Sequence, residues 1–209
     1  MCYRIFLEVY RDDLEEDFEI ASASPLVSRF AERGSVLKTY GDIFPSDVVP
    51  VLAPGKDRHV SAFPMKWGFT VPGRPVLANA RSETASEKPT FRDLWKSRRC
   101  LIPASGYYEW EHFVDSSGKR KTGDRYLIAP PKDRRIWIAG LYRIEDSLPV
   151  FTVLTRQATP ELGKIHDRMP LMFYPELKDD WIDPDGDPRR LLRYAVTDLE
   201  ARVDRKAKE

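Results

Sequence analysis

The sequence predicts an α+β fold, with a curved, largely antiparallel, barrel-like β-sheet and peripheral helices. Three observations favour this class: strand-like segments dominate the chain, helical segments are grouped at a few points, and the two do not alternate as they would around a parallel sheet. The 209 residues include 42% hydrophobic and 32% charged side chains, which is typical of a globular protein. We therefore expect a single domain over residues 1–209.

The chain begins with a predicted strand and two predicted helices. Residues 2–10 are rich in aromatic and β-branched side chains and predict the strand. The acidic residues 12–19 are typical of a solvated helix face. Ser24 and Pro25 then provide a cap and a first-turn proline for a second helix, and Gly34 ends it.

The next part of the chain predicts a hairpin and a short helix. Two apolar segments within residues 47–70 flank a Pro-Gly pair, as in a β-hairpin. Thr90 can cap a helix whose apolar face carries Phe91, Leu94 and Trp95.

Strands dominate the remainder. Five further segments have the composition of strands: residues 99–103, 106–113, 125–129, 135–144 and 149–155. A short helix is expected to open at Thr159, residues 167–173 return to extended chain, and residues 175–182 read as a surface helix. The last residues, 202–209, alternate in charge and are expected to fray.

Charge and hydropathy limit the kinds of partner that the protein is expected to have. With 34 basic and 33 acidic side chains the net charge is +1, so the overall charge does not indicate a nucleic-acid partner. No apolar run approaches membrane-span length, and Arg4 and Glu8 interrupt any signal peptide. We expect no membrane partner and a cytoplasmic location, or a nuclear one in a eukaryote. Residues 119–135 hold seven bases, which suit either a soluble edge strand or a rim that contacts phosphates.

The two cysteines, Cys2 and Cys100, are too few for a disulfide framework or a structural zinc site. We therefore expect no metal and no cofactor. Cys100 lies in an apolar run and reads as a small buried hydrophobe. Cys2 either begins a strand as inert packing or, once Met1 is removed, carries a free α-amine and a thiol on adjacent carbons.

Two further residues can transfer protons. His166 stands between a short helix and Asp167, where an imidazole can titrate near neutral pH or serve as a helix cap. Glu109 shares one side of a predicted strand with Tyr107. If that side faces the core, desolvation raises the pKa of the carboxyl toward the range of a general acid or base; otherwise the side chain points to solvent.

Three residues suit nucleic-acid contacts. Arg81 can bind phosphate, and Asn79, in a polar loop before a helix, can orient a carbonyl, a sugar or a base edge. Trp67 is either part of the core or an exposed ring that stacks on an unpaired base.

Five separated motifs occur in an order that resembles the SRAP family of SOS-response-associated peptidase-like, abasic-site processing proteins. They are Met1-Cys2, Trp67-Gly68, Asn79-Ala80-Arg81-Ser82-Glu83-Thr84, Arg99-Cys100-Leu101-Ile102-Pro103 with Gly106-Tyr107-Tyr108-Glu109-Trp110, and Ile165-His166-Asp167-Arg168-Met169-Pro170. The resemblance runs from Cys2 to about Val203. It implies one α+β domain with a barrel-like sheet that binds single-stranded DNA and links its terminal cysteine to the aldehyde of an abasic site.

The resemblance also implies roles for individual residues. Cys2 would be the nucleophile, Asn79 and Glu109 would lie beside the linkage, and His166 would transfer protons. The residues that resemble the family's DNA contacts are Arg4, Trp67, Arg81 and, from a loop that matches only loosely, Pro45. Tyr3 departs from the family, which usually carries glycine there.

The expected reaction needs an amino-terminal cysteine. The α-amine attacks the aldehyde to give an imine, and the thiol then closes a thiazolidine. Reversal and strand cleavage by β-elimination are expected side reactions of a monomeric protein whose partner is single-stranded DNA with abasic sites. Two rival functions remain open: a cysteine peptidase that uses Cys2 and His166 and removes its own Met1, and a non-covalent single-stranded DNA-binding module. A purely structural protein is the remaining alternative.

Overall fold

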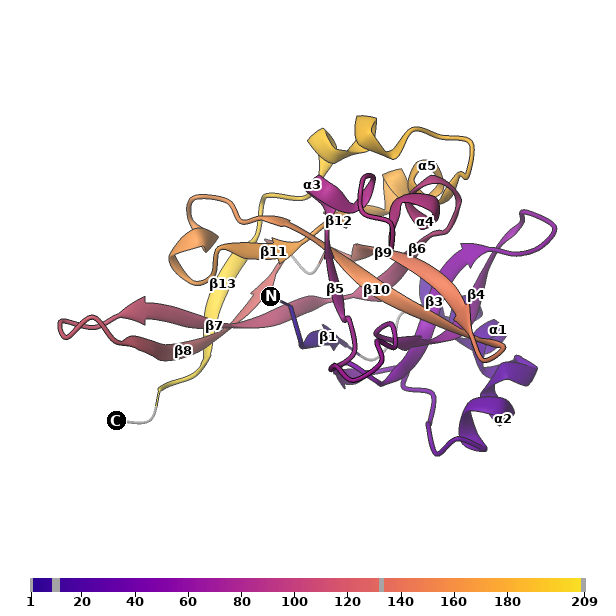
Figure 1. Ribbon diagram of the computed structural model, residues 1–209, viewed down its shortest axis with the longest axis horizontal. Helices are drawn as coiled ribbons and strands as arrows, with labels where there is room; N and C mark the ends of the chain where they lie inside the picture. The colour runs from indigo at the N-terminus through magenta and orange to yellow at the C-terminus, as the bar shows by residue number, and fades with distance from the viewer. Residues whose placement is uncertain (1, 9–11, 132–133, 208–209) are drawn as a thin grey trace.

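Five strands close on one another to form a barrel at the centre of the protein (Figure 1). The computed structural model describes residues 2–8, 12–131 and 134–207. The barrel strands, in the order in which they pair, are β10 (Leu148–Gln157), β4 (Val60–Trp67), β3 (Val48–Pro54), β6 (Arg99–Ala104) and β9 (Ile136–Glu145), which pairs back onto β10. All of these pairs except β4–β10 are antiparallel. The predicted barrel-like α+β fold is confirmed.

A second sheet of five strands lies against the barrel, and its longest hairpin extends away from it (Figure 1). Its strands, in spatial order, are β13 (Glu200–Arg205), β8 (Arg120–Ala129), β7 (Gly106–Val114), β1 (Ile5–Leu7) and β2 (Gly41–Ile43). The start of the chain is therefore held between β7 and β2, with Ile5 opposite Tyr107 on one side and Ile43 on the other. The part of the first predicted strand at residues 9–10 lies outside the described residues.

The carboxyl-terminal prediction was wrong in part. Residues 200–205 do not fray but pair with β8, where Arg202 lies opposite Leu127. The Asp204 carboxylate also accepts a hydrogen bond from Nε of Arg125 at 2.6 Å. Backbone pairing and this ion pair account for the order of the strand, although all six of its residues are exposed.

Three short strands extend the barrel sheet toward the start of the chain. They are β5 (Asn79–Arg81) and β11 (Arg168–Pro170), which both pair with β10, and β12 (Met172–Phe173), which pairs with β9. The prediction of a polar loop at Asn79 was wrong, because its backbone forms a parallel pairing with Val153. The site motifs are thus fixed to the barrel wall by backbone hydrogen bonds.

The first two helices follow the sequence signals. They are α1 (Asp12–Ala23) and α2 (Pro25–Ala31). Ser24 Oγ accepts a hydrogen bond from the Leu26 amide at 3.3 Å and caps α2, and Gly34 follows with a φ of 75°, which a residue with a side chain rarely adopts.

The remaining helices are short. They are α3 (Ser82–Ala85), α4 (Arg92–Ser97), η2 (Leu162–Lys164), η3 (Pro175–Leu177), α5 (Lys178–Ile182) and η4 (Pro188–Tyr194). Thr90 does not cap α4, since Phe91 occupies the cap position without a side-chain hydrogen bond. Residues 175–182 are not a surface helix, because Trp181 is fully buried against Phe173. Within the described ranges, no helix is long and apolar enough to cross a membrane.

The charged side chain of Arg99 is buried beside the barrel. Arg99 is 1% exposed and directs its guanidinium at five backbone carbonyls, those of Trp95, Lys96, Trp181, Asp183 and Gly186. A guanidinium has five N–H donors, so this group is completely satisfied. It ties α4 and α5 to β6, and we refer to it below as the Arg99 cluster.

Candidate active site

Cys2 lies at the entrance to β1 and is buried, with 1% of its surface exposed. Burial raises the pKa of its thiol to about 12, and the nearby charge of Glu109 acts in the same direction. Both cysteines of the chain are free thiols, as predicted. At neutral pH the Cys2 sulfur is therefore a neutral thiol.

Asn79 holds the start of the chain by its backbone. Its Nδ2 donates a hydrogen bond of 2.8 Å to the Cys2 carbonyl oxygen. The amide is 8% exposed, and no donor among the described residues reaches its Oδ1. This buried acceptor is free to bind a hydroxyl or an N–H of a substrate.

Glu109 lies on the inner face of β7. The side chain is 7% exposed and shares this face with Tyr107, which is 1% exposed, so the alternative in which Glu109 points to solvent is wrong. Burial raises the pKa of the Glu109 carboxyl, which brings its proton transfer closer to neutral pH. Its Oε1 accepts a hydrogen bond of 3.2 Å from the Trp110 amide.

His166 follows η2 and presents one ring nitrogen to the protein. Its Nδ1 lies 3.0 Å from both the Arg168 amide nitrogen and Oδ1 of Asp167. The neutral ring can accept from the amide, and the protonated ring can donate to the carboxylate. Burial lowers the pKa of His166, while Asp167 opposes this shift.

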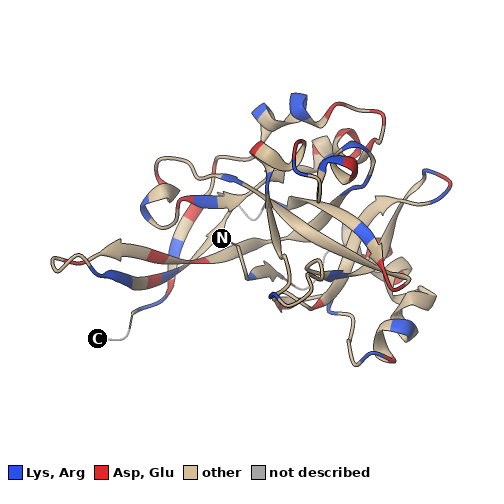
Figure 2. Ribbon diagram, viewed as in Figure 1, with Lys and Arg blue, Asp and Glu red and all other residues tan. Residues whose placement is uncertain are grey.

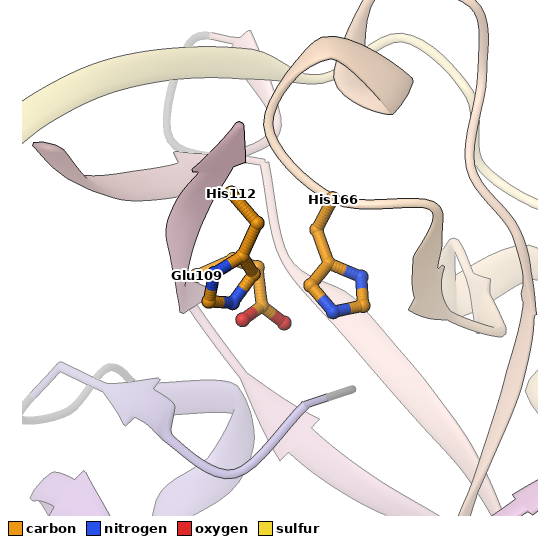
Figure 3. A group of neighbouring side chains, drawn as sticks. All are labelled: Glu109, His112 and His166. Carbon is orange, nitrogen blue, oxygen red and sulfur yellow. The ribbon is translucent and has the colours of Figure 1, made fainter. Parts of the chain in front are cut away.

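Glu109 and His166, two of the predicted site residues, lie close to His112, which the sequence did not indicate. Figure 3 shows the carboxylate of Glu109 between the rings of His112 and His166. One ligand atom of each of the three residues lies within 4.8 Å of the others, and the two rings meet edge to face with centroids 5.6 Å apart.

A β-bulge explains how His112 reaches this site. Residues 109 and 112 should face opposite sides of a regular strand. The pairing of β7 with β8 shifts register between Trp110 and His112, where two residue steps on β7 face three on β8, so the extra residue lies in β8. A bulge of this kind increases the local twist of the paired strands. The His112 amide also donates 3.1 Å to the Ile165 carbonyl, which fixes β7 to the segment that carries His166.

An ion pair joins two of the site segments. Arg168 donates two hydrogen bonds of 2.8 Å to the carboxylate of Glu83 and a third, of 2.7 Å, to the Thr155 carbonyl. Burial alone would raise the pKa of Glu83, but the hydrogen bonds from Arg168 lower it to about 2. Because Arg168 also binds His166 through its amide, the pair sets the position of the imidazole relative to β5 and α3.

The predicted DNA contacts lie in different surroundings. Arg81 is exposed at the end of β5. Arg4 is paired with Asp42 and stacks over the ring of Tyr108, 4.4 Å from its centroid. Pro45 is half-buried in the loop after β2. These three predictions remain untested.

The structure contradicts an exposed Trp67. The ring is fully buried, donates 2.8 Å to the Ala78 carbonyl and stacks on Phe151. Gly68 explains the turn that follows: its φ is 110°, and a Cβ there would lie 2.8 Å from the Val76 side chain. Trp67 is a core residue and has no free face for a base.

The basic segment at residues 119–135 is not one phosphate-binding rim. Figure 2 shows basic residues of β8 beside acidic residues of β7. Arg125 is paired with Asp204 and lies 5.5 Å from the centroid of the Trp110 ring, and Arg134 stacks on Tyr174. Arg120 and Lys121 instead line a pocket of about 290 Å³ together with Thr122 and the two site histidines.

The chain matches a known family over almost its whole length. The model of the family described as SOS response associated peptidase (SRAP) matches residues 1–205. The abasic site processing protein YobE of Bacillus subtilis is 29% identical over 217 residues, covering 96% of this chain and 93% of YobE. The abasic site processing protein YedK of Escherichia coli is 31% identical over 137 residues, covering 61% of this chain and 57% of YedK. HMCES of Xenopus tropicalis, also named an abasic site processing protein, is 27% identical, covering 57% and 44%.

Solved structures share the fold. A phage-related protein from Bordetella bronchiseptica superposes with a TM-score of 0.72 at 23% identity, covering 98% of this chain and 95% of that one. A protein from Bacteroides thetaiotaomicron gives a TM-score of 0.70 at 18% identity, with 98% and 92% covered. At these identities the likeness establishes the barrel architecture.

Proposed function

The chain belongs to the SOS response associated peptidase (SRAP) family, and from this premise we propose that it processes abasic sites in single-stranded DNA by linking Cys2 to them covalently. Its relatives in Bacillus and Escherichia are named abasic site processing proteins. The observation that supports the proposal most directly is the hydrogen bond from Asn79 to the Cys2 carbonyl. It fixes the backbone of Cys2, whose thiol lies near enough to Glu109 for the charge of that carboxylate to raise its pKa.

The proposed reaction begins with the amine of Cys2 after Met1 has been removed. The amine adds to the aldehyde carbon of the open sugar, and loss of one water gives an imine. The thiol sulfur then adds to the imine carbon while its proton passes to the nitrogen. A five-membered thiazolidine results, and one water is released for each link formed.

The pKa shifts favour attack by the amine over attack by sulfur. Burial raises the pKa of the Cys2 thiol to about 12, so very little of it is thiolate at pH 7. An α-amine titrates near 7.7 to 8.0, so on the order of a tenth of it is neutral at that pH. The nitrogen is the available nucleophile, and the sulfur is needed only for the second step.

The pKa shifts of Cys2 and His166 argue against the cysteine peptidase function. That mechanism needs a thiolate beside a protonated imidazole. Burial raises the pKa of Cys2 and lowers the pKa of His166, and both changes disfavour the ion pair. Autoproteolytic removal of Met1 therefore remains the weaker alternative.

Glu109 and His166 have complementary roles in the proposal. The raised pKa of Glu109 allows it to take a proton from the amine and return it to the leaving water. His166 directs Nε2 at the sugar and, when protonated, donates to the ring oxygen and opens the sugar to its aldehyde. Each role contributes roughly 10² to 10⁴ in rate. The imine also allows slow reversal and strand cleavage by β-elimination.

The strand is held by residues around the mouth of the site. Arg81 is exposed beside Asn79 and is placed to bind phosphate. Since Trp67 is buried, the stacking surface is assigned to Tyr3, which follows the nucleophile and is 50% exposed. Binding should weaken as salt rises.

The experiment is incubation of protein lacking Met1 with a single-stranded oligonucleotide that contains one abasic site. We expect a heat-stable adduct on a denaturing gel and a mass equal to protein plus DNA minus one water. The Cys2→Ala protein keeps the carbonyl that Asn79 binds but should form no thiazolidine. An adduct of equal yield and stability from Cys2→Ala contradicts the proposal.

Two controls separate the rival functions. Cys100→Ala removes the other buried thiol, and its adduct yield should equal that of the wild type. A non-covalent binding module would bind abasic and intact strands equally and would be unaffected by Cys2→Ala. Protein that retains Met1 should bind DNA without linking to it.

A further inference from the structure

Three side chains with metal-binding atoms converge, and two of them come from one strand at the point where its pairing with β8 shifts register. They are Glu109 and His112 of β7 and His166 after η2, with ligand atoms within 4.8 Å of one another (Figure 3). From this geometry we propose that the protein binds a Zn²⁺ ion through these three residues, and that the ion blocks the DNA-linking site.

The spacing suits a small metal ion. Three atoms no more than 4.8 Å apart leave a central point about 2.8 Å or less from each, so a movement of about 0.7 Å brings them to the bond lengths of zinc, near 2.1 Å. Rotation of the exposed His112 ring provides part of that movement. The carboxylate of Glu109 already lies between the two rings.

The donor set selects the metal. Two imidazole nitrogens and one carboxylate oxygen form a common ligand set for zinc with one open position. Mg²⁺ and Ca²⁺ prefer oxygen ligands, and only one of these three ligands is oxygen. The open position faces a pocket of about 290 Å³ that His112 and His166 line, which provides a route for the ion and room for water.

Two basic side chains line the same pocket, and they allow the alternative of an anion-binding site to be tested. Arg120 and Lys121 line the pocket together with the two histidines. They would attract phosphate if the pocket were an anion site, and they would weaken zinc binding slightly by charge repulsion. The Lys121→Gln variant therefore distinguishes the two ligands.

The consequence for activity rests on the proposed function. A metal ion on Glu109 and His166 would occupy the carboxylate and imidazole that transfer protons there. His112 has no part in the proposed linking reaction. Zinc should therefore inhibit linkage through a residue that linkage itself does not need.

The binding experiment titrates Zn²⁺ into the protein against a chromophoric chelator and repeats the titration with Co²⁺, whose visible absorption reports tetrahedral coordination. We expect one equivalent to bind. His112→Phe keeps a ring next to His166 but removes both nitrogens, and it should weaken binding at least about 100-fold, more than the loss of an outer-shell partner. His59→Ala, an exposed histidine on the β3–β4 hairpin, is the matched control and should bind as the wild type does.

The outcomes decide the proposal. Equal zinc affinity in wild type and His112→Phe, or no stoichiometric binding in the wild type, overturns it. Weaker binding of inorganic phosphate by Lys121→Gln, with no zinc bound by either protein, assigns the pocket to an anion and also overturns it. Equal or tighter zinc binding by Lys121→Gln supports it.

A second readout keeps this proposal separate from the proposed function. Zinc should slow adduct formation by the wild type and leave His112→Phe unaffected, and a chelator should restore the rate. If no adduct forms under any condition but zinc binds through His112, the proposed function fails and the metal site stands. If adduct forms and zinc neither binds nor inhibits, the metal site fails alone.

Discussion

The Arg99 cluster and the site around Glu109 are both buried and polar, yet they are built on opposite principles. Arg99 has a carbonyl acceptor for each of its five donors. At the site, Asn79 keeps an acceptor for which the described residues supply no donor, and the carboxyl of Glu109 has a raised pKa. A satisfied buried group stabilises the fold, whereas an incompletely satisfied one costs stability and is available to a substrate.

The sharpest test of this difference is Glu109→Gln. We expect adduct formation to slow about 10² to 10⁴-fold because the general base is lost. The same change should raise the melting temperature at pH 7, since an amide is cheaper to bury than a carboxylate. Single-turnover gels and thermal unfolding measure the two effects.

The pH dependence of that stabilisation has a definite sign. The pKa of Glu109 is higher in the folded protein than its usual 4.5, so the wild type loses stability as pH rises through the folded value. The gain from Gln should thus be largest at neutral pH and vanish below about pH 4.5. A variant that melts lower than wild type at pH 7 would show that the carboxylate is structural.

Arg99→Met should have the opposite effects: it should lower the stability of the protein and leave the rate of adduct formation unchanged. Removing the guanidinium leaves several buried carbonyls without donors, and we expect a loss of about 3 kcal/mol or more in the free energy of unfolding. Urea denaturation measures this loss. The adduct rate per folded molecule should stay at the wild-type value.

Arg99→Lys serves as its control. A lysine retains the charge but offers three donors in place of five, so its stability should fall between those of the wild type and Arg99→Met. A variant that is fully stable but slow in linkage would place Arg99 in the active site.

The smallest effect is expected at the Glu83 and Arg168 pair, which combines both roles. Glu83→Gln should reduce stability by under about 1 kcal/mol, because the Glu83 side chain is 45% exposed. It should also shift the pH at which His166 titrates, measured by NMR of the imidazole, and slow linkage several-fold. An unshifted titration would limit the pair to a structural role.

The acid dependence of this pair also has a definite sign. The folded pKa of Glu83 lies at about 2, below its usual 4.5. The contribution of the Glu83 carboxylate to the free energy of unfolding is therefore complete above about pH 4.5, and it is lost as the pH falls through 2. Wild type and Glu83→Gln should differ at pH 7 and converge near pH 2.

The barrel could be predicted from the sequence. Strand composition predicted the barrel strands because half-buried and buried strands select β-branched and aromatic residues. The neighbourhood of Cys2 could be expected only through the family resemblance, since Asn79 lies 77 residues away in the chain. Local patterns do not specify such a contact.

The residues that the sequence predictions missed or left undecided have physical explanations. His112 was missed because alternation along a regular strand separates it from Glu109, whereas the β7–β8 pairing shifts register between Trp110 and His112. For Trp67 the sequence left both a core position and an exposed ring open, and the structure buries the ring against Phe151. Arg99 carries no sequence signal, since its acceptors are backbone carbonyls that any residue provides.

The bond between Asn79 and the Cys2 carbonyl sets an order of events during synthesis. At about 5 to 20 residues per second the ribosome needs roughly 4 to 15 seconds to add the 77 residues that separate the two. During that interval the nascent end has no docking partner in Asn79 and is open to an aminopeptidase. Trimming of Met1 can therefore precede the burial of Cys2, which is 1% exposed in the finished fold.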